Sequence, residues 1–233
     1  MGAGTPLVKI CGLMRNEDAR LAEEAGADYV GMVLSQGFGR SVPEGEGPAM
    51  IVGVSARRVA VTVDESAETS AALAHSIDAS VIQLHGGESV DTARTLRTLG
   101  PWSIWKAVRA RSIEDVGRVV EAFGETIDGV LVEGWRDGAI GGAGLTVDLD
   151  PRELSAVVPS SLTFILAGGL RPDSVGGAVA RFAPDVVDVS SGVERTPGSK
   201  DPALIEAFIH AARTATVDGR TTSRIEHTRD QHQ

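Results

Sequence analysis

Two side chains suited to proton transfer stand at the ends of short apolar runs. Cys11 closes the first run of the chain, and Glu133 follows Val130–Val132. Lys9 shares a strand face with Cys11, and its ammonium would lower the pKa of the thiol towards neutrality, which makes Cys11 a candidate base. A lone cysteine is more often an inert buried residue. Glu133 fits equally a solvated loop residue or a general acid with a raised pKa.

Two glycine turns late in the chain indicate an anion site. Gly168 and Gly169 follow one apolar run, and Ser191 and Gly192 follow another about twenty residues later. We expect a helix after each turn, so that free backbone N–H groups and the positive end of a helix dipole face a phosphate. A Gly-Gly pair alone is more often a tight turn, but its repetition on successive strand–helix units favours a shared phosphate site.

Other polar side chains stand at further strand ends. Arg40 lies in a glycine loop and could clamp a substrate carboxylate, although a solvated surface position is its simpler interpretation. His85 shares a strand face with Gln83, as Asp188 does with Ser190, and His85 fits a hydrogen-bonded core residue equally well. The histidines lack zinc-ligand spacing and no nucleotide-binding fingerprint occurs, so we expect no metal and no cofactor.

Eight strand-like runs alternate with helical patterns. Each run is rich in Val, Ile or Leu and ends at a polar or glycine turn, as buried parallel strands do. The strands are expected over residues 7–12, 29–34, 58–64, 81–86, 104–110, 129–133, 164–168 and 186–190. Helices are expected over 16–25, 66–75, 88–99, 112–123, 172–182 and 202–214, with weaker ones over 44–52 and 151–158. Asn16, Ser66 and Ser112 stand at expected N-caps.

This alternation predicts an α/β fold, a single-domain (β/α)₈ TIM barrel in preference to an open doubly wound sheet. Catalytic groups of such a barrel lie at the carboxyl ends of its strands, and phosphate sites lie after strands seven and eight. We expect an N-terminal arm over residues 1–6, the barrel over 7–215 and a disordered polar tail over 216–233.

Charge and composition exclude several classes of protein. The net charge of −10 argues against nonspecific nucleic-acid binding, so an anionic substrate must be held by local cations and backbone dipoles. No apolar run approaches the roughly 20 residues of a membrane span, and no signal peptide is evident. The single cysteine excludes an intrachain disulfide and favours a reducing compartment. We expect a cytoplasmic protein with a small-molecule partner and neither nucleic acid nor membrane.

The chain resembles the phosphoribosylanthranilate isomerase family of tryptophan biosynthesis over residues 7 to about 212. The matching segments are 9–12, 25–28, 39–43, 83–86, 141–144, 166–170 and 188–194. The Lys-Ile-Cys-Gly opening is specific, because sister isomerase barrels with two phosphate sites carry aspartate at the position of Cys11. Indole-glycerol-phosphate synthases, another related barrel, have catalytic lysines without counterparts here.

The resemblance implies a cofactor-free Amadori rearrangement of N-(5'-phosphoribosyl)anthranilate to 1-(o-carboxyphenylamino)-1-deoxyribulose 5-phosphate. A carboxylic acid protonates the furanose ring oxygen, the ring opens to a Schiff base, and a cysteine thiolate removes the C2 proton. Cys11 matches the family's base, Glu133 its acid, and Arg40 the arginine that faces the anthranilate carboxylate. Further residues expected to bind the substrate are Lys9, His85 and Asp188, and those expected to bind its phosphate are Gly142, Gly144, Gly168, Gly169, Ser191 and Gly192. The chain is expected to be a monomer or a homodimer.

Several positions depart from the family pattern. Glu133 replaces an aspartate and moves the acid by about an ångström, Leu145 replaces a polar residue, and Thr62 and Asp64 replace an aromatic residue and an asparagine. We expect these changes to cluster at the ring-opening end of the pocket. Two alternatives therefore stay open: a paralogue that rearranges another arylamine riboside phosphate in specialised metabolism, and a non-catalytic phosphosugar-binding barrel.

Overall fold

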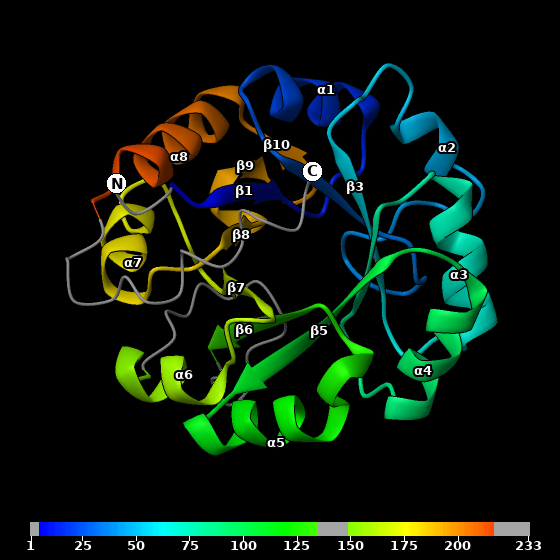
Figure 1. Cartoon of the computed structure of the whole chain (residues 1–233). Helices are drawn as coiled ribbons and strands as arrows, with labels where there is room; N and C mark the ends of the chain where they lie inside the picture. The colour runs from blue at the N-terminus through cyan, green and yellow to red at the C-terminus, as the bar shows by residue number, and fades with distance from the viewer. Residues whose placement is uncertain (1–4, 135–148, 217–233) are drawn as a thin grey trace.

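The computed structural model describes residues 5–134 and 149–216. Eight parallel strands form a closed barrel in chain order, with β1 paired to β8, which confirms the predicted TIM barrel (Figure 1). The strands are β1 (Leu7–Ile10), β2 (Tyr29–Val33), β3 (Arg57–Thr62), β4 (Val81–Leu84), β5 (Ser103–Ala110), β6 (Gly129–Gly134), β7 (Thr163–Ala167) and β8 (Val186–Val189).

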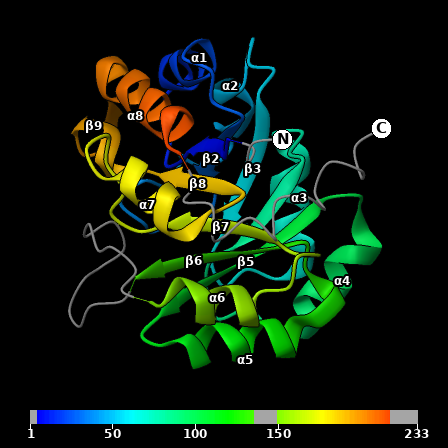
Figure 2. The same ribbon diagram turned by 60° about the vertical axis from the view of Figure 1, so that its left-hand side comes forward.

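Helices surround the barrel and cover its outer face. They are α1 (Asn16–Glu24), α2 (Gly47–Met50), α3 (Ala67–Ser76), α4 (Val90–Leu99), α5 (Ile113–Phe123), α6 (Pro151–Val157), α7 (Val175–Phe182) and α8 (Pro202–Thr214), with a short 3₁₀ turn, η1 (Gly124–Thr126), after α5. Seen from two directions, α5 and α6 lie side by side, as do α7 and α8 (Figure 2). No helix within the described ranges is long and apolar enough to cross a membrane.

The connection after β8 differs from the prediction. The helix expected over residues 202–214 is present as α8, but the Ser191–Gly192 turn itself continues as one 3₁₀ turn, η2 (Ser191–Val193). A small hairpin of β9 (Glu194–Thr196) and β10 (Ser199–Lys200) comes next, before α8 begins. The strands of this hairpin are too short to leave a period-two pattern, so it could not be predicted from the sequence.

The helix N-termini confirm two of the three predicted caps. Ser66 Oγ accepts a hydrogen bond from the backbone N–H of Thr69 at 3.1 Å, and Ser112 forms a capping box with Asp115. Asn16 was predicted wrongly, since it is the first residue inside α1. Its side-chain amide instead donates to backbone carbonyls beside α2, at 2.9 and 3.0 Å, and so ties α1 to α2.

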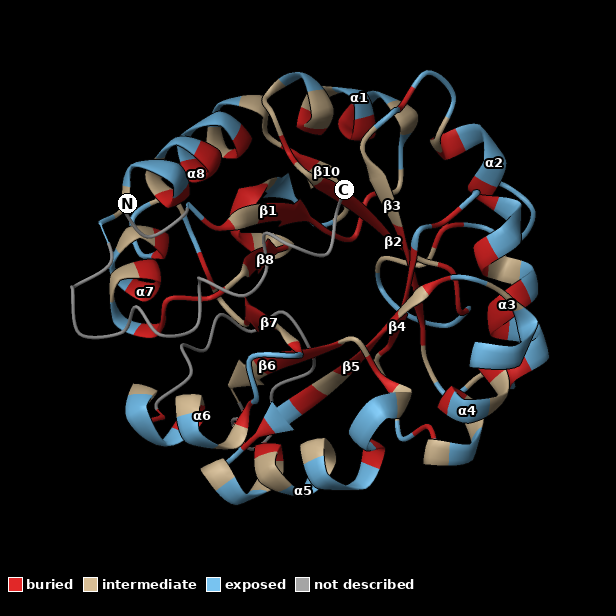
Figure 3. Ribbon diagram, viewed as in Figure 1, coloured by how far each residue is buried: buried red, intermediate tan, exposed pale blue. Residues whose placement is uncertain are grey.

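Alternation along the strands divides the core into two layers. Residues such as Val130 and Val132 of β6 face the helices, whereas Leu131 faces the barrel interior. The interior is filled by Tyr29, Val59, Val61, Val81, Trp105, Leu131, Ile165, Ala167 and Val186, with Cys11 at the carboxyl end. In Figure 3 the strands are largely buried, and the helices are exposed on their outer faces. On each strand, the residue two positions after an interior residue points to the same side. Such residues therefore lie together at the carboxyl ends of the strands.

Candidate active site

A cavity of about 440 Å³ lies at the carboxyl ends of the strands. It is lined by Cys11, Arg40, Gln83, His85, Arg109, Glu133, Gly168, Gly169, Asp188, Ser190, Ser191, Gly192 and neighbouring apolar residues. Most of the predicted site residues thus meet in one place, as the strand-end rule for this fold requires. Lys9 is fully buried and does not line the cavity. Gly142, Gly144 and Leu145 lie outside the described residues.

Cys11 is held in a charged but closed environment. Lys9 Nζ donates to Asp188 Oδ1 at 3.0 Å, and the two residues are register partners on β1 and β8. Burial raises the pKa of the Cys11 thiol; Lys9 lowers it and Asp188 raises it, so that the pKa stays above its ordinary value. The predicted fall towards neutrality is therefore wrong, because the ammonium is already paired and the thiol is buried.

Gly31 of β2 makes room for this arrangement. A Cβ atom at Gly31 would lie 2.9 Å from Cys11 Sγ, 2.9 Å from Lys9 Cε and 3.2 Å from Lys9 Nζ. Distances below 3.0 Å are closer than a real Cβ atom tolerates, so only glycine leaves the two side chains where they are. The sequence offered no sign of this role, since Gly31 stands within a strand rather than in a turn.

Glu133 lies at the opposite side of the strand ring and contacts two nitrogen donors. Arg109 Nε donates to Glu133 Oε1 at 2.8 Å, and His85 Nε2 lies 3.6 Å from the same oxygen. Burial raises the pKa of Glu133, but His85 and Arg109 outweigh it and hold the pKa below its usual value. A raised pKa, the state expected of a general acid, is therefore not what the free protein has.

Gln83 fixes the orientation of His85. Its side-chain amide nitrogen lies 2.9 Å from His85 Nδ1. This contact holds the imidazole ring with its Nε2 atom towards Glu133. Gln83 Oε1 is buried and has no hydrogen-bond partner among the residues that the structure describes.

Arg40 reaches the cavity with part of its guanidinium already engaged. Its Nε and Nη2 atoms bind the carboxylate of Glu194 at 2.7 and 2.6 Å, and Lys200 Nζ binds the same carboxylate at 3.0 Å. Lys200 also donates to the backbone carbonyl of Ser190 at 3.0 Å. Sequence reasoning missed the contributions of Glu194 and Lys200, because Lys200 depends on the unexpected hairpin.

The loops after β7 and β8 depend on glycine geometry. Gly168 and Gly169 have φ values of +90° and +66°, a region that side chains rarely adopt. A Cβ atom at Gly192 would lie 1.9 Å from the carbonyl oxygen of Leu170. The two loops therefore approach each other through their backbones at one edge of the cavity.

Two of the unusual positions face away from the cavity. The buried Thr62 accepts a hydrogen bond from Ser70 of α3 at 3.3 Å, and Asp64 accepts one from the backbone N–H of Gly87 at 2.6 Å. Neither lines the cavity. Their expected clustering at the ring-opening end is thus wrong. This orientation could have been predicted from the alternation of side chains along the strand, because Val61 and Val63 are the residues that line the cavity.

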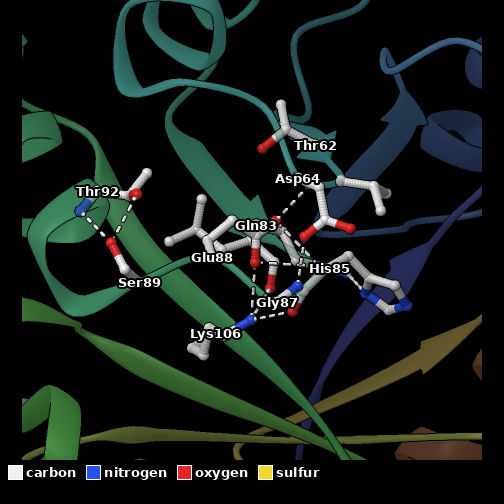
Figure 4. A network of polar contacts seen from close by, with 12 residues as sticks. Thr62, Asp64, Gln83, His85, Gly87, Glu88, Ser89, Thr92 and Lys106 are labelled. Atoms are coloured by element: carbon white, nitrogen blue, oxygen red, sulfur yellow. Dashed lines mark hydrogen bonds and ion pairs between the residues drawn. The ribbon is translucent and has the colours of Figure 1, made fainter.

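A buried ion pair braces the loops beneath His85 (Figure 4). Glu88 accepts hydrogen bonds from the backbone N–H groups of Asp64 at 3.1 Å and Gly86 at 2.9 Å, and from Lys106 Nζ at 2.8 Å. The loops after β3 and β4 are thereby joined to β5. No group of three histidine, cysteine, aspartate or glutamate side chains in the described part of the chain is placed to hold a metal ion.

Comparison with protein families gives one decisive match. The model of the N-(5'-phosphoribosyl)anthranilate (PRA) isomerase family matches residues 8–211. The chain belongs to this family. Family membership confirms the resemblance seen in the sequence and the predicted class of enzyme, an isomerase (intramolecular oxidoreductase) of tryptophan biosynthesis on a TIM barrel.

Individual PRA isomerases agree with this assignment over nearly the whole chain. The enzyme of Chromohalobacter salexigens is 39% identical over 206 residues, which are 87% of this chain and 92% of that protein. The enzyme of Rhodopseudomonas palustris is 36% identical over 214 residues, 90% of this chain and 96% of the relative.

Solved structures show the same correspondence. The PRA isomerase of Thermotoga maritima superposes with a TM-score of 0.78 at 30% identity, covering 89% of this chain and 98% of that one. Another PRA isomerase, solved with reduced 1-(o-carboxyphenylamino)-1-deoxyribulose 5-phosphate, gives a TM-score of 0.74 at 30% identity, with the same coverage of both chains.

Proposed function

We propose that this chain rearranges N-(5'-phosphoribosyl)anthranilate to 1-(o-carboxyphenylamino)-1-deoxyribulose 5-phosphate, with Cys11 as base and Glu133 as acid. The observation that carries the proposal is one cavity in which the thiol that directly follows β1 and a carboxyl group of β6 both meet the glycine loops after β7 and β8. The phosphate is assigned to the backbone N–H groups of these loops. Arg40 is assigned to the anthranilate carboxylate, through the Nη1 atom that Glu194 leaves open.

The reaction needs a neutral carboxyl group and a thiolate. Glu133 gives its proton to the furanose ring oxygen as the C1–O bond breaks, and the nitrogen lone pair forms the Schiff base. Cys11 then takes the proton from C2, and the resulting enolamine tautomerises to the ketone. Lys9 does not contact the substrate in this scheme, because it lies below the cavity and holds Asp188 and the thiol.

In the free protein the pKa shifts favour the opposite protonation states, a neutral Cys11 thiol and an ionised Glu133 carboxylate. Burial raises the pKa of Cys11, whereas His85 and Arg109 bring that of Glu133 below its usual value against the effect of burial. The productive form is therefore a minority state, reached by net transfer of one proton from Cys11 to Glu133. The pKa values of the two groups bound the pH range in which this form exists.

The position of the unusual residues favours anthranilate as the aryl group. Thr62 and Asp64 do not line the cavity, so they give no reason to expect a different aryl group. Glu133 is the departure that faces the site within the described ranges, and it keeps a carboxyl group there. A non-catalytic barrel is disfavoured because the thiol and the carboxyl group are both retained in one cavity.

Complementation tests the proposal. The chain is expected to restore growth without tryptophan to a bacterium that lacks this isomerase, and the Cys11→Ser variant, expressed at the same level, is expected to fail. Absence of growth with the folded wild-type chain, together with turnover of a different arylamine riboside phosphate, would favour the specialised paralogue. Growth supported equally by Cys11→Ser would remove the cysteine from the mechanism.

The oligomeric state and the cytoplasmic location stay predictions. The Thermotoga maritima enzyme is described as dimeric, with engineered monomers also solved. We propose a monomer or a homodimer for this chain, to be decided by sedimentation of the purified protein.

A further inference from the structure

Arg109 and Glu133 stand directly opposite each other on neighbouring strands. They are register partners in the β5–β6 ladder, and both belong to the alternate residues that face the barrel interior and its mouth. Arg109 Nε donates to Glu133 Oε1 at 2.8 Å. The guanidinium is therefore in direct contact with the carboxylate that we propose as the acid.

Among the described residues, Arg109 has one charged partner, Glu133. Its side chain is 47% exposed, whereas that of Glu133 is 13% exposed. Its two terminal nitrogen atoms make no hydrogen bond within the described residues, so its contact with Glu133 is its main anchor there. By contrast, three nearby cations are bound to other carboxylates: the buried Lys9 to Asp188, and Arg40 and Lys200 to Glu194.

Among the described residues, few charged groups surround Glu133. From β4 comes His85, at 3.6 Å, and from β5 comes Arg109. The register partner on β7 is the apolar Ala167, and across the cavity lie Cys11 and Asp188. Arg109 is thus the permanent positive charge in contact with Glu133 among the described residues.

The pairing also depends on side-chain length. The β5–β6 register fixes the separation of the two backbones, and the glutamate side chain is long enough to reach Arg109 Nε at hydrogen-bond distance. An aspartate at this position would withdraw the carboxylate by roughly an ångström, a displacement that can cost about 10²-fold in rate when it affects a catalytic group.

We propose that Arg109 is the positioning residue of the acid: it fixes the Glu133 carboxylate at the mouth of β6 and, with His85, sets the pH at which this carboxylate takes up the proton for ring opening. The inference rests on the proposed function, in which Glu133 is the acid. Geometry and charge are separable contributions, because a lysine at position 109 would keep the charge but lose the Nε–H donor.

The test uses Arg109→Gln and Arg109→Lys, with Arg118→Gln as a matched control. Arg118 lies on α5, pairs with Asp115 and does not line the active-site cavity. The measurements are kcat and KM with phosphoribosylanthranilate, and the titration of the Glu133 carboxyl carbon by carbon-13 NMR. Circular dichroism establishes that each variant is folded.

Arg109→Gln is expected to raise the titration midpoint of Glu133 by about one pH unit, since an adjacent opposite charge favours the carboxylate. Because the lower pKa of the pair sets the acidic limb of kcat/KM, that limb is expected to move upward by the same amount. Arg109→Lys is expected to leave the midpoint near its wild-type position while lowering kcat at least about 10-fold, with little change in KM. Arg118→Gln is expected to match the wild type in both measurements.

An unchanged Glu133 midpoint in Arg109→Gln, or a wild-type kcat in Arg109→Lys, overturns the inference. A double-mutant cycle provides a cross-check. Since Glu133→Asp is expected to break the contact with Arg109, Arg109→Gln should change kcat less in the Glu133→Asp enzyme than in the wild type. Glu133→Gln separates this inference from the function on which it rests. An active Glu133→Gln enzyme refutes the acid assignment, whereas an inactive one combined with wild-type behaviour of the Arg109 variants refutes the positioning role alone.

Discussion

At the β7–β8 end of the cavity the chain uses backbone, whereas at the β4–β6 end it uses side chains. The loops at the first end meet through Gly192 and the carbonyl of Leu170, with no room for a single extra carbon atom. At the second end, Glu133 is placed by His85 and by the half-exposed Arg109. The β7–β8 end therefore leaves no room for a side chain at Gly192, whereas at the β4–β6 end the contacts of Glu133 can be altered one side chain at a time.

The largest effect is expected at Cys11, which directly follows β1 and lies next to the end of β8. Cys11→Ser should lower kcat by about 10⁴-fold, the upper range for loss of a general base, because a hydroxyl supplies almost no basic form near neutral pH. Binding of reduced 1-(o-carboxyphenylamino)-1-deoxyribulose 5-phosphate should stay close to wild type in calorimetry. A kcat near that of the wild type would end the assignment of the base.

At the acid end, Glu133→Gln should lower kcat by roughly 10²- to 10³-fold, since an amide cannot protonate the ring oxygen. Steady-state rates between pH 6 and 9 provide the measurement. If the variant kept the wild-type kcat/KM throughout this range, another carboxyl group would have to serve as the acid, and the β4–β6 end would not be the acid end of the cavity.

Gly31→Ala tests whether the base tolerates displacement. The added methyl group would press on Cys11 Sγ and the Lys9 side chain, both 2.9 Å away, so we expect a loss of about 10- to 100-fold in kcat in a folded protein. Steady-state rates measure the loss of activity, and a thermal melt establishes that the variant is folded. Wild-type kcat would mean that the base can move without cost.

At the phosphate end, Gly192→Ala should raise KM by about 10-fold or more, because the two loops must separate and move their N–H groups from the phosphate. Gly177→Ala in α7 is the matched control, since a Cβ atom there meets nothing within 4 Å. Equal KM values for the two variants would contradict a rigid phosphate site.

The smallest effect is expected at Thr62, which belongs to neither end. Thr62→Val should leave kcat/KM unchanged and lower the stability by about 1 kcal/mol, because it removes the hydrogen bond with Ser70 but not the packing. Denaturant unfolding and steady-state kinetics give the two numbers. A changed preference among aryl groups would show that this position acts on the substrate after all.

Much of this architecture could be predicted from the sequence, because strand alternation and glycine turns are local signals. The eight strands, the convergence of Cys11 and Glu133, and the glycine loops all follow from them. The protonation states could not be predicted, since they depend on partners distant along the chain. The ammonium of Lys9 is paired with Asp188, which lies 179 residues further along the chain. Glu194 likewise engages Arg40 across 154 residues.

The two-layered wall of the barrel separates two kinds of change. Along each strand, alternate residues belong either to the helix-facing core or to the interior that ends in the cavity. Substitutions at the cavity-facing positions alter chemistry without disturbing the packing of helices on the sheet, and substitutions at the other positions do the reverse. New specificities can therefore arise on this scaffold one residue at a time while the frame that supports them keeps its fold.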